Sequence, residues 1–421
     1  MFRMKNKLNN LYNANREVKF ALVGAGKMGK GLVNQLSRIK GLTSSVVIDE
    51  KPEKAMEALI SSGVRKSDIT TSDNIKIIEN SIKNGMYVVS DDYSIACKLQ
   101  DIKGVVDATG NPPFGAILAM EAIENRKHTI MLNVECDAVI GPYLFNLAKK
   151  KNVIYTGSAG DEPGAIMELA DFALGAGFKL LAVGKGKNNP LNHYITEDEV
   201  REEAISKGLY PKMLAGFIDG TNTMIELTSA ANALGFVPDV IGCHGPNTTP
   251  AELAKIFSLK EQGGILNNYK TVDFAFGVAP GVYAIVTSDS DEVHDLMKYL
   301  KMGDGPNYAI YRPYHLTSLE TPITIYIVPA CGQVSDTVTV AKKDLKAGEI
   351  LEGIGGKSVF GTITSHADQK NRNLLPIAMI TKKTKLKVDV KKDELITLDM
   401  VELDEDHIIT KLRRKQDKLG L

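Results

Sequence analysis

A glycine-rich segment near the start of the chain has the spacing of a dinucleotide-binding loop. Residues 23–29 read VGAGKMG, a GxGxxG pattern that follows an apolar run and precedes residues with helical periodicity. In chain order, the three glycines would permit a tight turn, let the backbone approach a diphosphate, and let helix and strand pack closely. The diphosphate would meet unpaired N–H groups at the helix start. The predicted cofactor contacts in this loop are Gly24, Gly26, Lys27, Met28 and Gly29.

An acidic residue follows twenty positions after the last of these glycines. Asp49 ends a second apolar run, Ser45–Ile48. A carboxylate at this place can accept hydrogen bonds from both ribose hydroxyls and repels a 2′-phosphate, which favours NAD. Lys51 and Lys54 lie close enough to accommodate that phosphate, so the sequence leaves both NAD and NADP open as the cofactor.

Small and polar residues follow two further apolar runs. Because ligands of open α/β sheets bind beyond the carboxyl ends of the strands, these residues are expected at the cofactor. Glu135 could meet the nicotinamide or the substrate, or it could cap the helix that follows. The predicted contacts after these two runs are Thr109, Gly110, Asn111, Asn133 and Glu135.

The segment GKGKNNP, residues 184–190, is the strongest candidate for the reaction itself. It follows an apolar run and is expected to be a loop loosened by its glycines. A lysine there could donate a hydrogen bond to a carbonyl being reduced, donate a proton, or hold a phosphate. A solvated turn is the alternative. The predicted catalytic residues are Lys185, Lys187, Asn188 and Asn189.

Three more clusters of polar residues lie in turn-rich segments. Asp161 and Glu162 could orient a substrate or bind a hard metal, but acids also favour a helix start, and we favour the latter interpretation. His244 and His315 could act as acids or bases, although a loop histidine is more often structural. Arg312 could grip an anionic substrate. The sequence leaves any metal ion unidentified.

The elements that must position these residues follow from the pattern of apolar runs. From Val18 to Tyr155, short β-branched runs alternate with helical patterns, which predicts βαβ units around a doubly wound parallel sheet, a Rossmann fold. Residues 1–157 would form this domain. Residues 158–335 would form an α+β substrate and dimerisation domain, of which 311–335 could pack back onto the first. Residues 336–421 would form a small all-β domain with a charged tail at 411–418, either a solvated helix end or a frayed terminus.

Composition excludes several classes of protein. The chain has 421 residues, of which 43% are hydrophobic, and its 51 basic residues equal its 51 acidic ones, so neither nucleic acid nor an anionic membrane is an expected partner. The four cysteines form no CxxC pair, which fits a reducing compartment. With no signal peptide pattern and no apolar run of spanning length, a cytoplasmic location is expected.

The motifs together resemble a known family. GAGKMG, VVDATGNP, NVECD, SAGDEPG, GKGKNNP and YRPYHLTSLE, in this order, resemble the homoserine dehydrogenase-like oxidoreductases with a C-terminal SAF domain, and in particular the 1-deoxy-D-xylulose 5-phosphate reductoisomerase-like enzymes of some bacteria. The resemblance runs from about residue 8 to residue 404. It implies an NADPH-linked enzyme, dimeric or larger, with Lys185, Lys187, Asn188 and Asn189 near the substrate. Residues 336–404, with KKDLKAGEIL, resemble the SAF module, a β-clip fold.

Three functions follow as hypotheses. The first is an NAD(P)-dependent oxidoreductase acting on a small polar metabolite, with conversion of 1-deoxy-D-xylulose 5-phosphate to 2-C-methyl-D-erythritol 4-phosphate as the specific form that the resemblance suggests. The second is a dehydrogenase of homoserine or a related amino acid. The third is a protein that binds NAD(P) and carbohydrate without catalysis.

Overall fold

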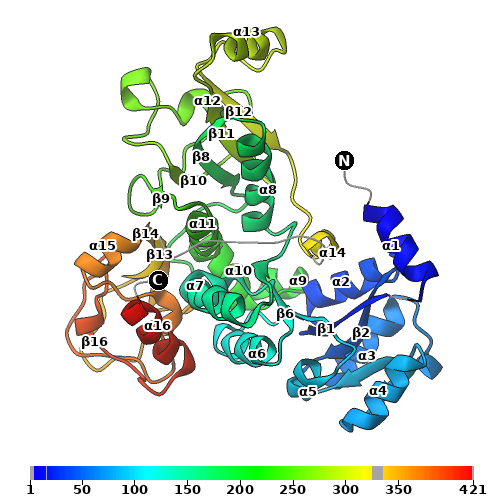
Figure 1. Ribbon diagram of the computed structural model, residues 1–421. Helices are drawn as coiled ribbons and strands as arrows, with labels where there is room; N and C mark the ends of the chain where they lie inside the picture. Colours follow the sequence, from blue (N-terminus) through cyan, green and yellow to red (C-terminus); the bar gives the residue numbers. More distant parts are fainter. Residues whose placement is uncertain (1–3, 16, 325–334, 420–421) are drawn as a thin grey trace. The chain divides into compact units, whose positions relative to one another are not determined.

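The computed structural model describes residues 4–15, 17–324 and 335–419 (Figure 1). They form two compact units. The first comprises the described residues of Met1–Asp137, Tyr143–Asp161 and Leu316–Ala330, and the second those of Ala138–Pro142, Glu162–His315 and Cys331–Leu421. No described helix is both long enough and apolar enough to cross a lipid bilayer.

The first unit is built on a parallel sheet in the strand order β3-β4-β2-β1-β5-β6-β7. Each neighbouring pair in it is parallel, which confirms the predicted Rossmann-like sheet. The apolar runs seen in the sequence become its strands, and the short β3 is an addition that they did not indicate. The strands are β1 (Val18–Val23), β2 (Leu42–Ile48), β3 (Ile69–Thr71), β4 (Tyr87–Ser90), β5 (Gly104–Asp107), β6 (His128–Met131) and β7 (Tyr155–Gly157).

Helices cover both faces of this sheet, which explains why its strands are apolar throughout. One core contains side chains of α2 and α3, and the other contains side chains of α4, α5 and α6. Leu22 and Leu32 are fully buried in the first core, and burial of each contributes roughly 1.5–3 kcal/mol. The helices are α1 (Met4–Asn13), α2 (Lys27–Leu36), α3 (Pro52–Ser61), α4 (Ile75–Lys83), α5 (Tyr93–Lys98), α6 (Pro112–Glu124), α7 (Val134–Lys151) and α14 (Thr321–Thr324).

The second unit contains a mixed sheet in the order β12-β11-β8-β10-β9. β8 pairs in parallel with β10 and antiparallel with β11. The strands are β8 (Lys179–Gly186), β9 (Val237–Pro238), β10 (Thr271–Ala275), β11 (Val282–Thr287) and β12 (Asn307–Arg312). The helices are α8 (Glu162–Gly175), α9 (Arg201–Ser206), α10 (Pro211–Ile218), α11 (Thr221–Leu234), α12 (Leu253–Ile256) and α13 (Asp291–Tyr299).

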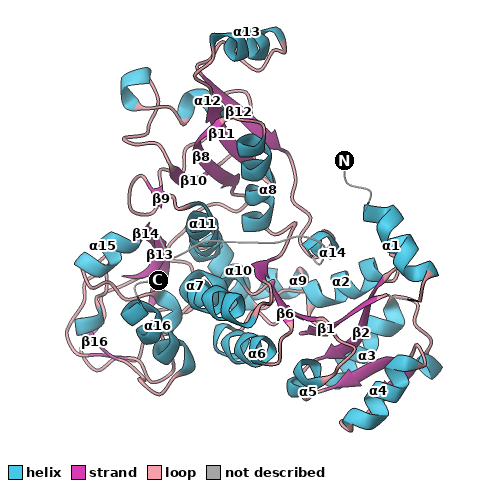
Figure 2. Ribbon diagram, in the orientation of Figure 1, coloured by secondary structure: helices cyan, strands magenta, loops and turns pink. Residues whose placement is uncertain are grey.

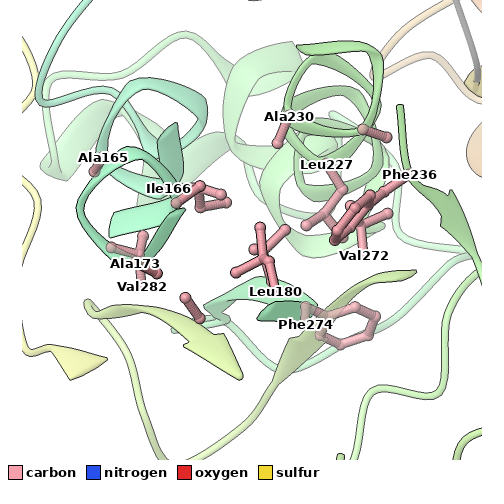
Figure 3. Close-up of a cluster of buried hydrophobic side chains, with 14 of the residues drawn as sticks. Ala165, Ile166, Ala173, Leu180, Leu227, Ala230, Phe236, Val272, Phe274 and Val282 are labelled. Carbon is pink, nitrogen blue, oxygen red and sulfur yellow. The ribbon is translucent and has the colours of Figure 1, made fainter. Parts of the chain in front are cut away.

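Two helices pack on one face of the mixed sheet. Side chains of α8 and α11, among them Ile166 and Leu227, meet Val272 and Val282 of the strands (Figure 3). A second core, which includes Phe257 and Tyr283, covers the other face. The strand β8 therefore lies in the middle of a sheet that is buried on both sides.

The C-terminal part of the second unit combines short strands with helices (Figure 2). β13 (Ser335–Ala341) contains the predicted strand and pairs antiparallel with β14 (Val359–Ser365), and β15 (Lys385–Leu386) pairs with β16 (Val401–Glu402). α15 (His366–Asn371) lies among these strands, so the expected all-β composition is wrong, and α16 (Ile408–Leu419) follows in the tail. The predicted three-domain division stays a prediction, and part of its returning segment, 325–334, lies outside the described residues.

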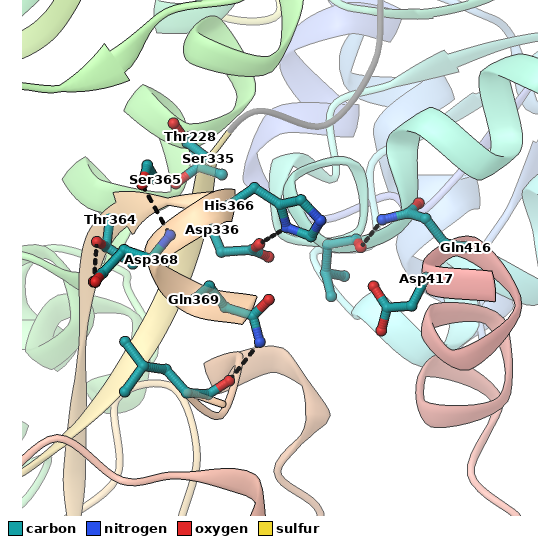
Figure 4. A network of polar contacts seen from close by, with 12 residues as sticks. Thr228, Ser335, Asp336, Thr364, Ser365, His366, Asp368, Gln369, Gln416 and Asp417 are labelled. Carbon is teal, nitrogen blue, oxygen red and sulfur yellow. Dashed lines mark hydrogen bonds and ion pairs between the residues drawn. The ribbon is translucent and has the colours of Figure 1, made fainter. Parts of the chain in front are cut away.

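The charged tail, expected to be a solvated helix end or a frayed terminus, is a helix, α16, and it is packed rather than solvated or frayed. Every third or fourth residue of α16 is buried, including Leu412, Arg413 and Gln416. The Arg413 guanidinium donates to both carboxylate oxygens of Asp336, which also faces His366 in the polar network of Figure 4. A charged side chain can be buried here because a carboxylate compensates it.

Candidate functional site

The glycine loop has the backbone geometry that a dinucleotide requires. Gly24 has a φ of +97°, and a Cβ there would lie 2.7 Å from the backbone of Ala108. A Cβ on Gly29 would lie 1.9 Å from the carbonyl oxygen of Gly24, so the helix can reach the strand only without a side chain. Gly26 differs from both, because a Cβ there would meet no atom within 4 Å. Its missing side chain leaves open space where a diphosphate would approach.

The helix that follows this loop offers its N-terminus to an anion. α2 begins at Lys27, its N-cap is Gly26, and no side chain of the described residues caps it. The first N–H groups of the helix are therefore available to a bound diphosphate. The residues present fit an NAD(P) diphosphate.

Asp49 stands directly after β2, beside the glycine loop. Its Oδ2 accepts a hydrogen bond from the Ala25 N–H at 2.8 Å and its Oδ1 accepts one from the Lys51 N–H at 3.0 Å. The carboxylate is buried, and it is held by backbone atoms rather than by a cation. It is thus oriented before any ligand binds.

Polar residues after β5 and β6 form one hydrogen-bonded network. Asp107 is fully buried and accepts from the backbone and hydroxyl of Thr109, at 2.9 and 2.6 Å, and from Asn133 Nδ2 at 3.0 Å. Asn133 Nδ2 also donates to the carbonyl oxygen of Asn111 at 2.9 Å. Burial raises the pKa of Asp107. The structure therefore brings together three of the predicted cofactor residues, and Gly110 lies between two of them with a φ of +60°.

Glu135 lies in the first turn of α7. The N-cap is Asn133, whose side chain accepts from the Cys136 N–H, and Glu135 is one of the two acidic residues in the first turn of the helix. Burial, together with the Asp107 carboxylate, raises the pKa of Glu135 to about 7. Glu135 can therefore exchange a proton near neutral pH.

Lys185 is the centre of an ionic cluster in the second unit. It lies in β8, which continues through Gly186, so the predicted loop is wrong for residues 184–186, whereas residues 187–190 do form a loop. The glycines of the strand serve packing instead, because a Cβ on Gly184 would lie 2.4 Å from the Tyr283 hydroxyl and one on Gly186 would lie 2.4 Å from Cα of Ala279. Successive side chains of a strand point to opposite faces, so Lys185, which stands between the two glycines, points to the other face of the sheet, where α8 and α11 pack.

Two carboxylates hold the Lys185 ammonium. Glu162 Oε1 accepts from it at 2.6 Å, and Glu226 forms a second, short ion pair with it. Burial alone would lower the pKa of Lys185, but these carboxylates outweigh burial and raise it above its usual value. The lysine is therefore a permanent cation with an exposed side-chain fraction of only 8%.

Glu162 and His315 bring two other predicted segments to this cluster. Nε2 of His315 lies 3.4 Å from Oε1 of Glu162. Burial raises the pKa of Glu162, but Lys185 and His315 outweigh burial and hold it at about 2. Glu162 stands in the first turn of α8, as the helix-start interpretation expected, and it also binds the lysine.

Glu226 was missed by the sequence analysis. It lies in α11, where it is the only charged residue of the helix. A lone charge within an otherwise buried helix was an available signal, because such charges are rarely buried without a partner. The helical pattern alone did not identify that partner.

Lys187 lies one residue beyond β8 and differs from Lys185. Its Nζ donates to the backbone carbonyl of Phe217 at 2.6 Å. Burial and repulsion by Lys185 lower the pKa of Lys187 to about 8, against the opposing carboxylates of Glu226 and Asp219. This lysine can lose and regain a proton near neutral pH.

The remaining predicted residues do not join this cluster by any contact described. Asn188 is exposed and Asn189 half-buried in the loop after β8. Asp161 belongs to the first unit. Arg312 pairs with Glu168 at 2.7 Å and stacks on Tyr314. These positions leave their predicted roles as predictions.

His244 belongs to a separate cluster. Its Nε2 lies 2.8 Å from Oδ2 of Asp239, and its backbone N–H donates to Asp273. Asp273 is in register with Gly184 in the sheet, hence on the face away from Lys185. Within the part of the chain that the structure describes, no group of three or more His, Cys, Asp or Glu side chains could hold a metal ion.

The comparison with protein families gives one match. Residues 160–321 match the model of the family described as the catalytic domain of oxidoreductase DRL. This range contains every member of the Lys185 cluster. No curated protein matches the chain.

Solved structures similar to the chain are dehydrogenases of low identity. A probable dehydrogenase from Thermotoga maritima is 10% identical over 96% of this chain and 88% of that one, with a TM-score of 0.38. A scyllo-inositol dehydrogenase from Lactobacillus casei with bound NAD(H) and scyllo-inositol is 12% identical over 65% and 74%, with a TM-score of 0.36. A myo-inositol dehydrogenase from Corynebacterium glutamicum is 14% identical over 64% and 72%, with a TM-score of 0.36.

The family match and the glycine loop agree with each other. Residues 160–321 match an oxidoreductase catalytic domain, and the loop of the first unit fits the diphosphate of a nicotinamide dinucleotide. The chain is an NAD(P)-dependent oxidoreductase.

Proposed function

We propose that the enzyme transfers hydride between NAD(P) and the carbonyl or alcohol carbon of a small polar metabolite, and that the Lys185 cluster binds the oxygen of that carbon. The observation that carries this proposal is the buried ammonium between Glu162 and Glu226. A fixed cation stabilises the negative charge that develops on a carbonyl oxygen during reduction, and it does so most strongly where water is excluded.

Lys185 and Lys187 would have different roles in the reaction. The bound dinucleotide supplies or accepts the hydride. Lys185 uses two N–H groups on carboxylates, which leaves the third to donate to the substrate oxygen. During reduction the electron pair of the C=O π bond moves to that oxygen. Lys187 then gives it a proton, and in the reverse direction the neutral amine of Lys187 accepts the proton of the alcohol.

The Lys185 cluster bears on the class of substrate. Two of the three N–H groups of its ammonium bind carboxylates, which leaves one donor for a single oxygen atom, whereas a phosphate presents several oxygens that need donors. We therefore assign a carbonyl or hydroxyl oxygen to Lys185. A substrate phosphate, as in the reductoisomerisation of 1-deoxy-D-xylulose 5-phosphate, would bind elsewhere. The family resemblance supports that reaction, and a homoserine or related amino-acid dehydrogenase is the alternative.

The test is a screen for oxidation of NADH and NADPH with sugar phosphates, polyols, hydroxy acids and amino-acid semialdehydes. Lys185→Met should lower kcat by 100-fold or more, because loss of one preorganised charge-stabilising group costs about 10²–10³ in rate. Lys357→Met, which breaks an exposed ion pair with Asp198, is the matched control. Turnover of none of these compounds would favour the third hypothesis, a binding protein without catalysis.

We attribute a preference for NAD over NADP to Asp49. Its fixed carboxylate would accept the ribose hydroxyls of NAD and repel the 2′-phosphate of NADP. Calorimetry with both reduced cofactors measures the preference, and Asp49→Asn should reduce it. Tighter binding of NADPH by the unaltered chain would contradict this assignment.

Three broader expectations accompany the function. Residues 336–404 are proposed to be a SAF module, on the strength of the family resemblance. A homodimer or larger assembly is proposed because α13 and the residue after it expose Leu296, Tyr299 and Leu300. Light scattering would measure the assembly. A cytoplasmic location remains an expectation from the sequence.

A further inference from the structure

The C-terminal residues of the second unit pack on the helix that carries Glu226. The Gly361 N–H donates to Thr221 Oγ1 at 2.9 Å, and the hydroxyls of Thr228 and Thr337 lie 2.8 Å apart. Thr221 and Thr228 belong to α11. Thr337 belongs to β13, and Gly361 belongs to β14. The C-terminal strands β13 and β14 therefore pack on α11.

A buried lysine from this C-terminal part reaches the start of α11. Lys342 follows β13 directly, and only 2% of its side chain is exposed. Its Nζ donates to the carbonyl oxygens of Ile195, at 2.8 Å, and Gly356, at 2.9 Å, and lies 3.0 Å from Oδ2 of Asp219. Two backbone carbonyl oxygens thus accept hydrogen bonds from this ammonium, and the Asp219 carboxylate forms an ion pair with it.

Asp219 stands at the turn between α10 and α11. Its other oxygen, Oδ1, accepts from the Thr221 N–H at 2.8 Å, and Gly220 between them has a φ of +89°. The carbonyl that binds Lys187 belongs to Phe217, two residues before Asp219. Glu226, which binds Lys185, is carried by the helix that this turn begins. The two helices that this turn joins thus each carry a partner of one lysine, α10 for Lys187 and α11 for Lys185.

We propose that Lys342 is a positioning residue of the catalytic cluster, which acts through Asp219 to fix the α10–α11 turn and the charge beside Lys187. The proposal rests on the function proposed above and gives the C-terminal residues a part in the reaction. Lys342 touches neither lysine of the cluster in any contact described, so its effect is indirect.

The charges around Lys187 set the direction of the expected effect. Lys185 on β8 lowers the pKa of Lys187, whereas Glu226 on α11 and Asp219 at the turn raise it. Burial raises the pKa of Asp219, and the Lys342 ammonium opposes that shift. Without Lys342, Asp219 would therefore hold its negative charge less well, and Lys187 would lose one source of stabilisation for its own positive charge.

The experiment follows Lys187 by NMR in full-length protein with ¹³Cε-labelled lysine, its signal assigned by its absence in Lys187→Met. In the unaltered chain the signal should titrate near the pKa of about 8. Lys342→Met should lower the thermal unfolding midpoint, because it leaves a carboxylate buried without a cation. Asp219→Asn with Lys342→Met removes both charges and should recover most of that midpoint. The Lys187 titration in this double variant should nevertheless lie below that of the unaltered chain.

A purely structural role makes a different prediction. In that case the double variant, once stable, would titrate at Lys187 as the unaltered chain does, and this result would overturn the proposal. An unfolding midpoint that Lys342→Met leaves unchanged would overturn it as well. If the double variant does not fold, Asp219→Asn with Lys342→Gln gives the same comparison, because the amide can still donate to the Ile195 and Gly356 carbonyls. Lys357→Met, from the same C-terminal part, should change neither measurement.

This readout needs no substrate, so two failures can be told apart. An unchanged Lys187 titration rejects the role of Lys342 and leaves hydride transfer intact. Absence of NAD(P)H oxidation with every substrate rejects the proposed reaction and leaves the titration result standing.

Discussion

Lys185 and Lys187 lie two residues apart and have opposite acid–base behaviour. Lys185 is held by Glu162 and Glu226, which keep it charged, whereas Lys187 donates to a neutral carbonyl and has a lowered pKa. The difference arises from their partners, because both side chains are buried to a similar extent. A fixed cation suits charge stabilisation, and a titrating amine suits proton transfer.

The ion pair of Glu162 predicts how stability depends on pH. The pKa of this carboxyl is about 2 in the folded chain, against an ordinary value of 4.5. A lowered carboxyl pKa stabilises the folded state above pH 4.5, and this contribution is lost as pH falls towards 2. Glu162→Gln should therefore reduce the free energy of unfolding at neutral pH and reduce it by progressively less in acid. Urea denaturation at several pH values measures the difference, and a difference that stays constant with pH would contradict it.

Two glycines of the cofactor loop should respond differently to alanine. Gly26→Ala adds a Cβ into open space, so the unfolding midpoint should hardly change while NAD(P)H binds more weakly. Gly29→Ala places a Cβ 1.9 Å from a backbone oxygen, so it should lower both stability and cofactor affinity. Thermal unfolding and calorimetric titration of the two variants measure this contrast. Equal cofactor affinity in Gly26→Ala and the unaltered chain would place the diphosphate elsewhere.

At the residue scale, the sequence predicted single members of the cluster but not their partners. Lys185, Glu162 and His315 were each predicted from local patterns of polar and turn residues. Which of them would meet was not predictable, since they lie on three segments far apart in the chain. Glu226 was missed because an amphipathic pattern says which face of a helix is buried and nothing about a charge on that face.

At the scale of elements, α16 shows that a charged sequence can form a packed helix. Arg413, with 1% of its side chain exposed, binds Asp336 and Asp417. Burial raises the pKa of Asp336, but Arg413 outweighs burial and lowers it. The composition of residues 411–418 favoured a solvated helix, because a run of lysines and arginines predicts exposure to solvent. The sequence does not show which carboxylates would pair with them in the folded chain.

Breaking the Arg413 pair should be costly. Arg413→Met leaves Asp336 buried without its main cation and should reduce the free energy of unfolding by about 3–5 kcal/mol. Arg414→Met in the same helix removes an exposed pair with Glu405 and should change it by less than about 1 kcal/mol. Chemical denaturation of both variants gives the comparison, and similar losses from the two would show that α16 contributes no buried ion pair.

The sequence analysis assigned the end of β8 wrongly. Its last residues, GKG, were predicted as a loop because glycine is common in loops. In the structure these glycines face Tyr283 and Ala279 at distances that admit no side chain. Glycine in a strand can mark a close approach of another backbone, and the sequence alone did not distinguish this from a turn.

At the scale of the whole molecule, the parallel sheet was predictable and the path of the chain was not. Short apolar runs that alternate with helical patterns predicted the parallel strands, because a strand that is buried on both faces is apolar at consecutive residues. The return of residues 316–324 to the first unit and the packing of residues 335–419 within the second depend on contacts between distant segments. No local pattern reports such contacts.

The packing of the C-terminal residues predicts the effect of removing them. Deletion of residues 335–421 would expose the face of α11 that β13 and β14 cover, so the second unit should lose its cooperative unfolding transition. The first unit should still bind NAD(P)H, because its sheet and glycine loop lie outside the deleted range. Calorimetry and cofactor titration of the truncated chain measure the two effects. A second unit that still unfolds cooperatively would show that these strands are dispensable.

The discontinuous path of the chain has a consequence for its synthesis. A ribosome that has just released β7 has made all seven strands of the first sheet, but not the returning residues 316–324 that belong to the same unit. Glu162, which binds Lys185, meets His315 only when the chain has been made to just before that return, and Asp219 meets Lys342 later still. A nascent chain therefore holds the parallel sheet and the glycine loop of the first unit long before the residues that contact Glu162 and Asp219 from the C-terminal side have been made.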